Sequence, residues 1–329
     1  MGKTIIYKLK PKSPFHIGGS GIGIEKTWEI IHSDTIFSAI VSTWKALGEK
    51  VDYNGNMELL KPFSDLNNPP FKLSSAFPYS NDVLFFPAPM IKSGVDKKER
   101  KAQFISSKVL QSGKISGSVP KQDSKVYVSE TEKEIVPDTM WMSGYNAIVP
   151  RVTIDRISSA SAIFHCGLLI FSENCGLYFW VELFDETYEN HLNKAIEFLS
   201  EEGIGGERSI GCGRFIYSDP EPASLPIIEN PDNYMTLSLY HPTYDEVMAG
   251  ILDNSHYELI TRRGWLYSPD GGSGRRRNVK MLAEGSVFSK PSLVGDILDV
   301  RPKGWSHHPI YDYGLAFTLP IKWGGELSA

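Results

Sequence analysis

Apolar and polar residues alternate at the start of the chain. Residues 3–11 (KTIIYKLKP) follow a period of two, which predicts a first strand. After a glycine-rich turn, apolar residues recur at helical spacing over 36–47, with Ser33 or Asp34 as the expected N-cap and Gly48 as the stop. The pattern therefore predicts a strand followed by a helix that is buried along one side.

The middle of the chain switches between interrupted and strongly apolar stretches. Prolines and aromatic residues crowd 62–89, which predicts short extended pieces, and the polar stretch 92–135 is typical of an insertion. Residues 151–161 (RVTIDRISSAS) alternate and carry two arginines, which indicates an extended hairpin arm that leaves the body of the protein. Two apolar runs, 162–171 and 175–184, predict a central β-hairpin of the main sheet.

A predicted helix then leads into a glycine loop. Residues 187–200 carry apolar side chains at mostly helical spacing, the loop 203–213 (GIGGERSIGCG) follows, and 214–217 has the composition of a strand. The resulting order, strand-helix-strand-strand-helix-strand with a large insertion, is the ferredoxin-like pattern. RNA-recognition domains use the same sheet to bind RNA.

The second half predicts another unit of the same kind. Four prolines in 218–231 indicate a linker, and beyond it the strand and helix patterns start again at 234–240. We therefore expect an α+β protein of two ferredoxin-like (RRM-like) domains. The first, 1–220, carries the thumb or hairpin insertion at about 88–160, and the second spans 221–329.

Composition and charge limit the function classes. The chain has 329 residues, of which 41% are apolar and 22% charged, and a net charge of −5, so it is not a generally basic nucleic-acid coat, although local basic patches remain possible. Its three cysteines form no CxxC pair, and no 18 apolar residues run together. We expect a cytoplasmic protein that is neither secreted nor inserted in a membrane.

The loop 203–213 combines glycines with charge. Glycine lets the backbone approach an anion closely, and Arg208 lies inside the loop. No Gly-Lys-Ser/Thr closes it, and the helix-loop-strand order reverses that of a dinucleotide site. If the first and last strands of the domain are neighbours, the first glycine turn, with Gly18, Gly19 and Gly21, lies beside this loop, and the two turns together form a groove.

Arginines gather next to glycines elsewhere in the chain. The densest cluster is Arg275, Arg276 and Arg277 after GGSG, for which a solvated loop is the alternative to phosphate binding. Further arginines lie in segments that look exposed: Arg151, Arg156, Arg208, Arg214, Arg262 and Arg263. So many scattered arginines favour an anionic polymer over a single small anion.

Histidines raise the question of catalysis. His16 in the first glycine turn and His32 before the first helix could act as general base or acid of a ribonuclease, but a structural role is the stronger interpretation, because His32 suits capping or packing and no second catalytic partner lies at a defined spacing. His307 and His308 lack a cysteine or carboxylate partner at metal-ligand spacing. We therefore assign no catalytic residue, no metal site and no cofactor.

Several stretches are shared with one known family. They are GIGGERSIGCGRF, HSDTIFSAI after a glycine turn, SSAFPY followed by FFPAPM, HYELITRRGW, and GSVFSK with VGDILDVRP. With these motifs, which span both halves, the chain resembles the RAMP proteins of CRISPR effector complexes, and within them the fourth Csm subunit of type III-A systems. The glycine loop marks the superfamily, and the C-terminal stretches favour this subunit over its type III-B equivalent.

The resemblance implies a non-catalytic cap subunit. Such a subunit holds the 5′ tag of the crRNA in a groove between two ferredoxin-like domains, lies near target RNA, and contacts a large polymerase-like subunit and the backbone RAMP subunits. The loop residues that match the family are Gly205, Gly206, Arg208, Ser209, Gly211 and Gly213, and Arg151 and Arg156 match its basic arm loosely. Two other functions remain open: a RAMP endoribonuclease that processes precursor crRNA, and a glycine-loop enzyme acting on nucleotides.

Overall fold

The largest sheet of the protein is built from its first half. The structure is a computed structural model, and it describes residues 2–18, 23–49, 59–91, 102–113, 126–128, 145–266, 274–305 and 308–322. The sheet has nine strands in the order β10-β1-β9-β3-β4-β5-β6, with β11 beside β1 and β2 beside β9. Their bounds are β1 (Lys3–Pro11), β2 (Phe71–Leu73), β3 (Phe77–Ser80), β4 (Val83–Pro87), β5 (Ala102–Ser106), β6 (Val126–Val128), β9 (Cys175–Leu183), β10 (Phe215–Ile216) and β11 (Glu221–Pro222). All pairs are antiparallel except β5 with β6.

Strands β1 and β9 are buried on both faces. Successive side chains of a strand point to opposite faces, so Phe179 enters one core while Tyr178 and Trp180 enter the other. This double burial explains why β9 is an unbroken apolar run (CGLYFWVEL) rather than an alternating one.

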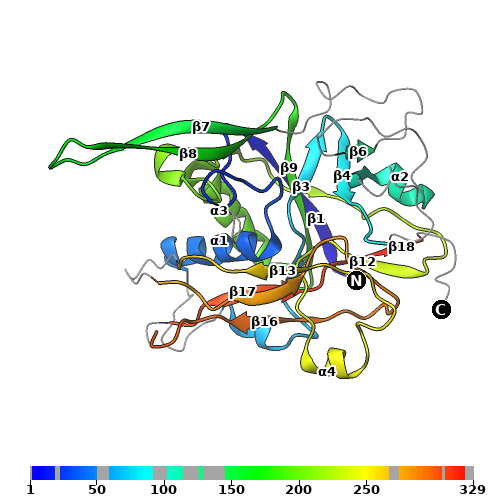
Figure 1. Cartoon of the computed structure of the whole chain (residues 1–329). Helices are drawn as coiled ribbons and strands as arrows, with labels where there is room; N and C mark the ends of the chain where they lie inside the picture. The colour runs from blue at the N-terminus through cyan, green and yellow to red at the C-terminus, as the bar shows by residue number, and fades with distance from the viewer. Residues whose placement is uncertain are drawn as a thin grey trace.

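Two helices cover one face of the sheet (Figure 1). They are α1 (Ser33–Ala46) and α3 (Thr187–Glu202), and both lie within a residue or two of the predicted bounds. Trp44 of α1 is fully buried and donates its indole N–H to the carbonyl of His191 on α3 at 2.8 Å, which joins the two helices. Shorter helices are η1 (Lys61–Ser64), α2 (Ser107–Ser112), η3 (Arg208–Ile210) and α4 (Tyr244–Met248).

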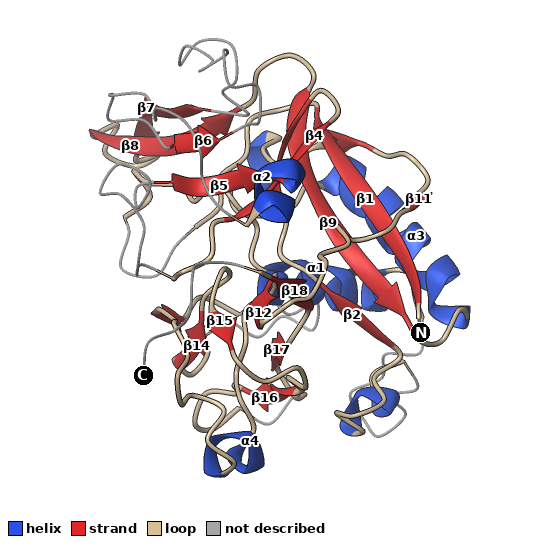
Figure 2. Cartoon of the chain, turned by 90° about the vertical axis from the view of Figure 1, so that its right-hand side faces the viewer, coloured by secondary structure: helices blue, strands red, loops and turns tan. Residues whose placement is uncertain are grey.

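The second half forms smaller sheets, which lie below the large sheet in Figure 2 and pack against its other face. The strands are β12 (Asn233–Thr236), β13 (Leu259–Arg262), β14 (Val279–Leu282), β15 (Val287–Phe288), β16 (Gly295–Asp299), β17 (Tyr311–Leu315) and β18 (Thr318–Ile321). They form a three-stranded sheet, β15-β12-β18, and the pairs β13-β14 and β16-β17. The described residues thus form a mixed α/β protein of mostly antiparallel sheets with few helices.

The two larger hydrophobic clusters combine residues of both halves, while a smaller cluster around Tyr240 and Phe288 belongs to the second half alone. Met235 and Leu319 of the second half pack in one cluster with Trp180 of β9, and Tyr313 packs in the other cluster with Phe37 of α1. The rings of Phe37 and Tyr313 lie 4.9 Å apart. The division at residue 220 stays a prediction, and the two halves share part of their buried surface.

A long hairpin projects from the body (Figure 1). Strands β7 (Tyr145–Ile154) and β8 (Ser161–Ile170) pair from Tyr145 with Ile170 to Ile154 with Ser161. The predicted arm over 151–161 is therefore its outer part. The prediction that 162–171 pairs with 175–184 is wrong: β8 pairs with β7, while β9 pairs with β1, β2 and β3. Sequence pattern alone does not select the partner of an apolar strand.

None of the helices in the described ranges is long and apolar enough to cross a membrane. Gly19 and Gly21 lie outside the described residues, as does most of the polar insertion over 92–135.

Candidate nucleic-acid interface

The glycine loop after α3 lies directly on the turn that follows β1. The N–H of Gly206 donates to the carbonyl of His16 at 2.8 Å, and the N–H of Gly213 donates to the carbonyl of Pro14 at 2.9 Å. Since β1 and β10 pair, the two turns meet at the same end of the sheet. These contacts confirm the prediction that the glycine loop lies beside the first glycine turn. Of the three predicted glycines on that turn, the structure describes Gly18.

Most glycines of the loop are required by the protein itself. Gly205 has φ +96°, and a Cβ on it would lie 2.6 Å from the carbonyl oxygen of His16. A Cβ on Gly206 would lie 2.8 Å from the His16 ring. Gly211, with φ +89°, has nothing within 4 Å of the same position. Close packing of the two turns therefore explains Gly205 and Gly206, whereas the space beside Gly211 is open.

A cavity of about 700 Å³ opens between the loop, α1 and the second half. Its walls come from the first glycine turn, one side of α1, the loop 203–208, the segment 262–266 and the segment 308–311. A second hollow of about 440 Å³ lies on the loop itself, between Glu202 and Ser209. Gly205, Gly206 and Arg208 line both spaces.

Two of the predicted arginines, the buried Arg262 and the half-buried Arg276, anchor the fold. Arg262 donates from Nε and Nη2 to the two carboxylate oxygens of Asp34 at 2.8 and 2.9 Å, and from Nη2 to the hydroxyl of Thr35 at 3.1 Å. Arg276 donates to Asp34 at 3.2 Å and also to Asp312. Both carboxylates are fully buried. These guanidinium groups fix the second half on the start of α1, so their charge is already compensated within the protein.

Burial sets the protonation of this network. Desolvation alone would raise the pKa of Asp34, but the charges of Arg262 and Arg276 outweigh it and hold the pKa below its ordinary value. For Asp312, desolvation together with the charge of Asp34 raises the pKa to about 7 despite Arg276. The Oδ2 atom of Asp312 is buried and lacks a hydrogen-bond partner within the described residues. Asp34 is thus held ionised, whereas Asp312 has a pKa near neutral pH.

The exposed cationic groups lie on the connection between β13 and β14, the two strands of one hairpin. Arg263, Arg275 and Arg277 are exposed, and Arg277 donates to the carbonyl of Asp299. The guanidinium of Arg275 lies 5.0 Å from the ring centroid of Trp265, which is 70% exposed and lines the cavity. Sequence reasoning missed Trp265, although the run RRGW placed an aromatic side chain directly beside two arginines.

The arm arginines have separate surroundings. Arg151, which pairs with Phe164 in the outer part of the arm, forms an ion pair of 3.5 Å with Glu207 of the glycine loop. Arg156 lies in the exposed turn at the tip, which the carboxylate of Asp155 closes by accepting from the backbone N–H groups of Ile157 and Ser158. Arg151 therefore joins the arm to the loop, and Arg156 does not line the cavity.

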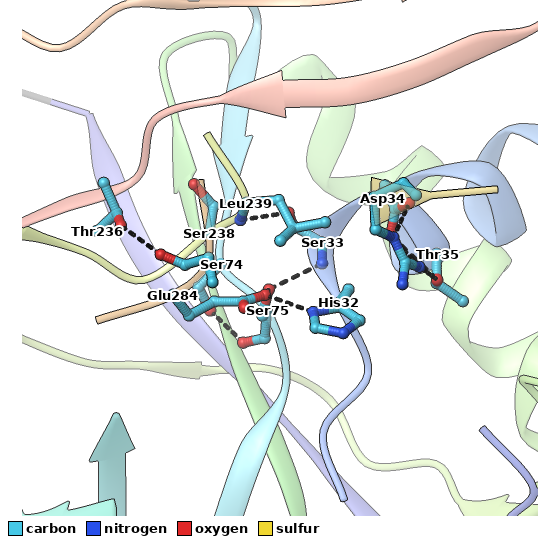
Figure 3. A network of polar contacts seen from close by, with 12 residues as sticks. His32, Ser33, Asp34, Thr35, Ser74, Ser75, Thr236, Ser238, Leu239 and Glu284 are labelled. Carbon is cyan, nitrogen blue, oxygen red and sulfur yellow. Dashed lines mark hydrogen bonds and ion pairs between the residues drawn. The ribbon is translucent and has the colours of Figure 1, made fainter. Parts of the chain in front are cut away.

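The two candidate catalytic histidines have structural partners. His16 is buried, and its Nδ1 lies 2.7 Å from the carbonyl oxygen of Gly167. His32 is also buried, with Nδ1 2.8 Å from Glu284, which in turn accepts from the hydroxyl of Ser75 (Figure 3). Within the described ranges, no three His, Cys, Asp or Glu side chains are grouped so that they could hold a metal ion.

Comparison with known families decides what kind of chain this is. The profile of the RAMP superfamily matches residues 8–216, which is more than half of the chain. The chain belongs to the RAMP superfamily. The profile described as the CRISPR Csm4 C-terminal domain matches residues 229–321, so this RAMP protein is of the Csm4 kind.

Curated relatives of this RAMP protein carry the name CRISPR system Cms protein Csm4. The protein from Thermococcus onnurineus is 28% identical, and the match covers 98% of both chains. The protein from Methanocaldococcus jannaschii is 25% identical over 97% of this chain and 98% of its own length. The protein from Streptococcus thermophilus is 26% identical over 88% and 91%.

Solved structures show the same RAMP fold. A chain of the Csm3-Csm4 subcomplex of the type III-A CRISPR-Cas interference complex superposes with a TM-score of 0.64 at 22% identity, covering 97% of this chain and 99% of that one. A chain of the Csm1-Csm4 cassette in complex with cA4 superposes with a TM-score of 0.59 at 21% identity, covering 98% and 100%.

Proposed function

We propose that this chain is a non-catalytic subunit of a type III-A CRISPR RNA-guided interference complex. In this role it binds the 5′ tag of the crRNA and bridges the large polymerase-like subunit to the backbone RAMP subunits, in the cytoplasm and in antiviral defence. Relatives named Csm4 match almost the whole length of the chain, and the structures that share its fold come from Csm3-Csm4 and Csm1-Csm4 complexes. This support favours the type III-A subunit over its type III-B equivalent.

The observation that carries the proposal is the cavity between the glycine loop and the arginine-bearing hairpin. Its walls combine Arg208 and Arg263 with the backbone of the glycine loop on Gly205 and Gly206. Arginine forks suit phosphate oxygens and position a nucleic-acid strand without reading its sequence, and glycine lets a loop backbone approach the strand closely. An aromatic side chain, Trp265, lies at the same wall, and single-stranded RNA is recognised where bases can stack on such rings.

We also propose that both halves are ferredoxin-like units. In the first half, the antiparallel order β10-β1-β9-β3 with α1 and α3 supports this topology. In the second half, the order β18-β12-β15 continues through the bridges between Tyr240 and Leu282 and between His256 and Val287 to β14 and β13. A ferredoxin-like unit has two helices. In the second half, α4 follows the first strand β12 as the first helix would, whereas the segment before the last strand β18 contains β16 in place of a second helix. We place the domains at 1–220 and 221–329, with the arm as part of a thumb insertion at about 88–160.

The histidines favour a binding role over RNA cleavage. A general base must reach the proton that it abstracts. His32 is 3% exposed, and its Nδ1 atom is hydrogen-bonded to Glu284. The Nδ1 atom of His16 lies within hydrogen-bond distance of the backbone carbonyl of Gly167. The ribonuclease alternative predicts that His16→Ala or His32→Ala abolishes cleavage of a repeat-containing RNA. Equal cleavage, or none, in the parent and both variants removes that alternative.

The proposal is tested by purifying the chain with its native partner subunits and sequencing the RNA that accompanies it. We expect crRNA with an intact 5′ tag. The double variant Arg208→Ala with Gly206→Asp should reduce retention of that RNA or assembly of the complex. Arg263→Ala is a milder variant that leaves the packed turns alone. Removing this arginine should reduce the salt dependence of RNA affinity by the amount that corresponds to about one phosphate contact. Unchanged retention in both variants would contradict the proposal.

A further inference from the structure

We propose that Trp265 is a stacking platform for one nucleobase of single-stranded RNA, with Arg275 bracing the ring. This inference rests on the proposed function, because it names one contact within the RNA-binding groove. It concerns a side chain that lies on the second half of the chain, on the wall facing the glycine loop.

The position of Trp265 follows from a short extension of the β13-β14 hairpin. Trp265 pairs with Arg275 in an isolated bridge, the N–H of Leu266 donates to the carbonyl of Gly274 at 2.8 Å, and the N–H of Arg276 donates to that of Gly264 at 3.1 Å. Residues directly opposite each other in an antiparallel pair have neighbouring side chains. Trp265 and Arg275 therefore lie on the same face of the hairpin.

The base of the same hairpin is clamped. Arg262 and Arg276, which flank the Trp265-Arg275 pair along the two strands, both donate to the buried carboxylate of Asp34 at the start of α1. The alternation of a strand sends these two side chains to the buried face and Trp265 to the other face. The buried ion pairs thus hold the ring in place on the wall of the cavity, which lowers the entropy lost when a ligand stacks on it.

The ring is unusually open for tryptophan. Trp265 is 70% exposed, and the guanidinium of Arg275 lies over its ring in a cation–π contact, 5.0 Å from the ring centroid. A cation on one face leaves the opposite face for a second flat group. Nucleobases of any sequence offer a π-face to such a ring. An aromatic side chain braced in this way is suited to a base rather than to packing within the monomer.

The remaining wall of the cavity supplies what a nucleotide needs besides stacking. Arg208 and Arg263 are cationic, and Glu202 is the one carboxylate among the described residues that line the space. The volume of about 700 Å³ exceeds the space that one base would fill. Cations spread over both walls match the phosphates of successive nucleotides in a strand. A free mononucleotide has its phosphates at one end only, so we favour RNA.

Abasic scanning of the RNA tests the contact. The partner-bound complex is prepared with the parent chain, with Trp265→Ala and with Trp265→Phe, and the affinity for tag-containing RNAs is measured with one base removed at a time. Loss of one stacked base should weaken binding by about 5- to 100-fold. We expect one abasic position to weaken binding to the parent by this factor and to have no further effect on Trp265→Ala, while Trp265→Phe stays within about fivefold of the parent.

Tyr244→Ala is the matched control, because Tyr244 is 76% exposed on α4 and does not line the cavity. It should bind like the parent, and unfolding curves should show that all variants fold. RNA binding that is unchanged in Trp265→Ala overturns the stacking inference but leaves the proposed function intact. A parent complex that binds no RNA overturns both. If AMP or ATP bound saturably, more tightly than RNA and in a manner that depends on Trp265, the ligand of this ring would be a mononucleotide, and the inference of an RNA base would be wrong.

Discussion

Arg262 and Asp34, which are 228 positions apart in the sequence, are joined by two parallel hydrogen bonds of 2.8 and 2.9 Å. Asp34 lies in the first turn of α1 and Arg262 ends β13, so the pair connects the two halves of the chain. A bidentate pair fixes the relative orientation of its two groups as well as their separation. The wall formed by the second half is therefore set relative to the glycine loop by an internal contact, before any ligand binds.

Asp34→Asn should destabilise the protein strongly. The substitution keeps the shape of the side chain but removes the carboxylate that pairs with the buried Arg262, while Arg276 keeps its ion pair with Asp312. Breaking a buried pair by removing one charge typically costs about 3–5 kcal/mol. The free energy of unfolding in urea measures the effect. Glu221→Gln breaks the exposed pair with Lys8 and should change stability by less than about 1 kcal/mol. Equal effects of the two substitutions would show that the buried pair is not a clamp.

Stability should depend on the protonation of Asp312 between pH 4 and pH 7. Its pKa is raised from 3.8 to about 7 in the folded protein, so in this window the folded state holds a proton that the unfolded state has released. The contribution of Asp312 to stability therefore falls as pH rises, by up to about 1.4 kcal/mol per pH unit, and levels off above pH 7.

Asp312→Asn removes this titration while keeping an oxygen that can accept from Arg276. Urea unfolding at pH 5, 6, 7 and 8 should show a variant whose stability relative to the parent improves steadily up to pH 7. The same difference at every pH would mean that Asp312 does not titrate in this range.

Gly205→Ala should disturb the packed turns more than Gly211→Ala. Both residues have positive φ, which costs an L-residue about 1–2 kcal/mol, but a Cβ at position 205 also meets the His16 carbonyl at 2.6 Å. Added overpacking of about 1–3 kcal/mol is expected there and not at position 211, where the space is open. Thermal unfolding of the two variants gives the comparison. A Gly211→Ala variant that is equally unstable would place the cost in the backbone conformation alone.

Shortening the arm should leave the body intact. The outer arm carries exposed apolar side chains, among them Ile154 and Ile157, of which Ile157 is 95% exposed. Replacing residues 152–163 by Asn-Gly, a favoured two-residue hairpin turn, should change the free energy of unfolding by less than about 1 kcal/mol, because few buried contacts are lost. If the arm acts as a thumb, the assembled complex should retain crRNA and respond differently to target RNA. Loss of crRNA in this variant would instead assign the arm to tag binding.

Local pattern in the sequence was sufficient where burial is one-sided or short-range. The periodicity of 36–47 and 187–200 predicted α1 and α3 because each helix buries one side of its own sequence. The alternation over 3–11 predicted β1, although this strand is buried on both faces. The glycine loop was recognisable because five glycines lie within residues 203–213, but only the structure shows that packing against the first turn accounts for Gly205 and Gly206. Its place beside the first turn followed from the expected order of the strands, and the pairing of β1 with β10 confirmed it.

What the sequence did not decide was which elements pair and which charges are free. An apolar strand such as β8 carries no mark of its partner, and only the fold shows that it belongs to the arm. Arg262 and Arg263 are adjacent and chemically identical, yet Arg262, at the end of β13, pairs with the buried Asp34 while Arg263 is exposed. The role of an arginine depends on where the acids of distant segments lie, and that is a property of tertiary structure.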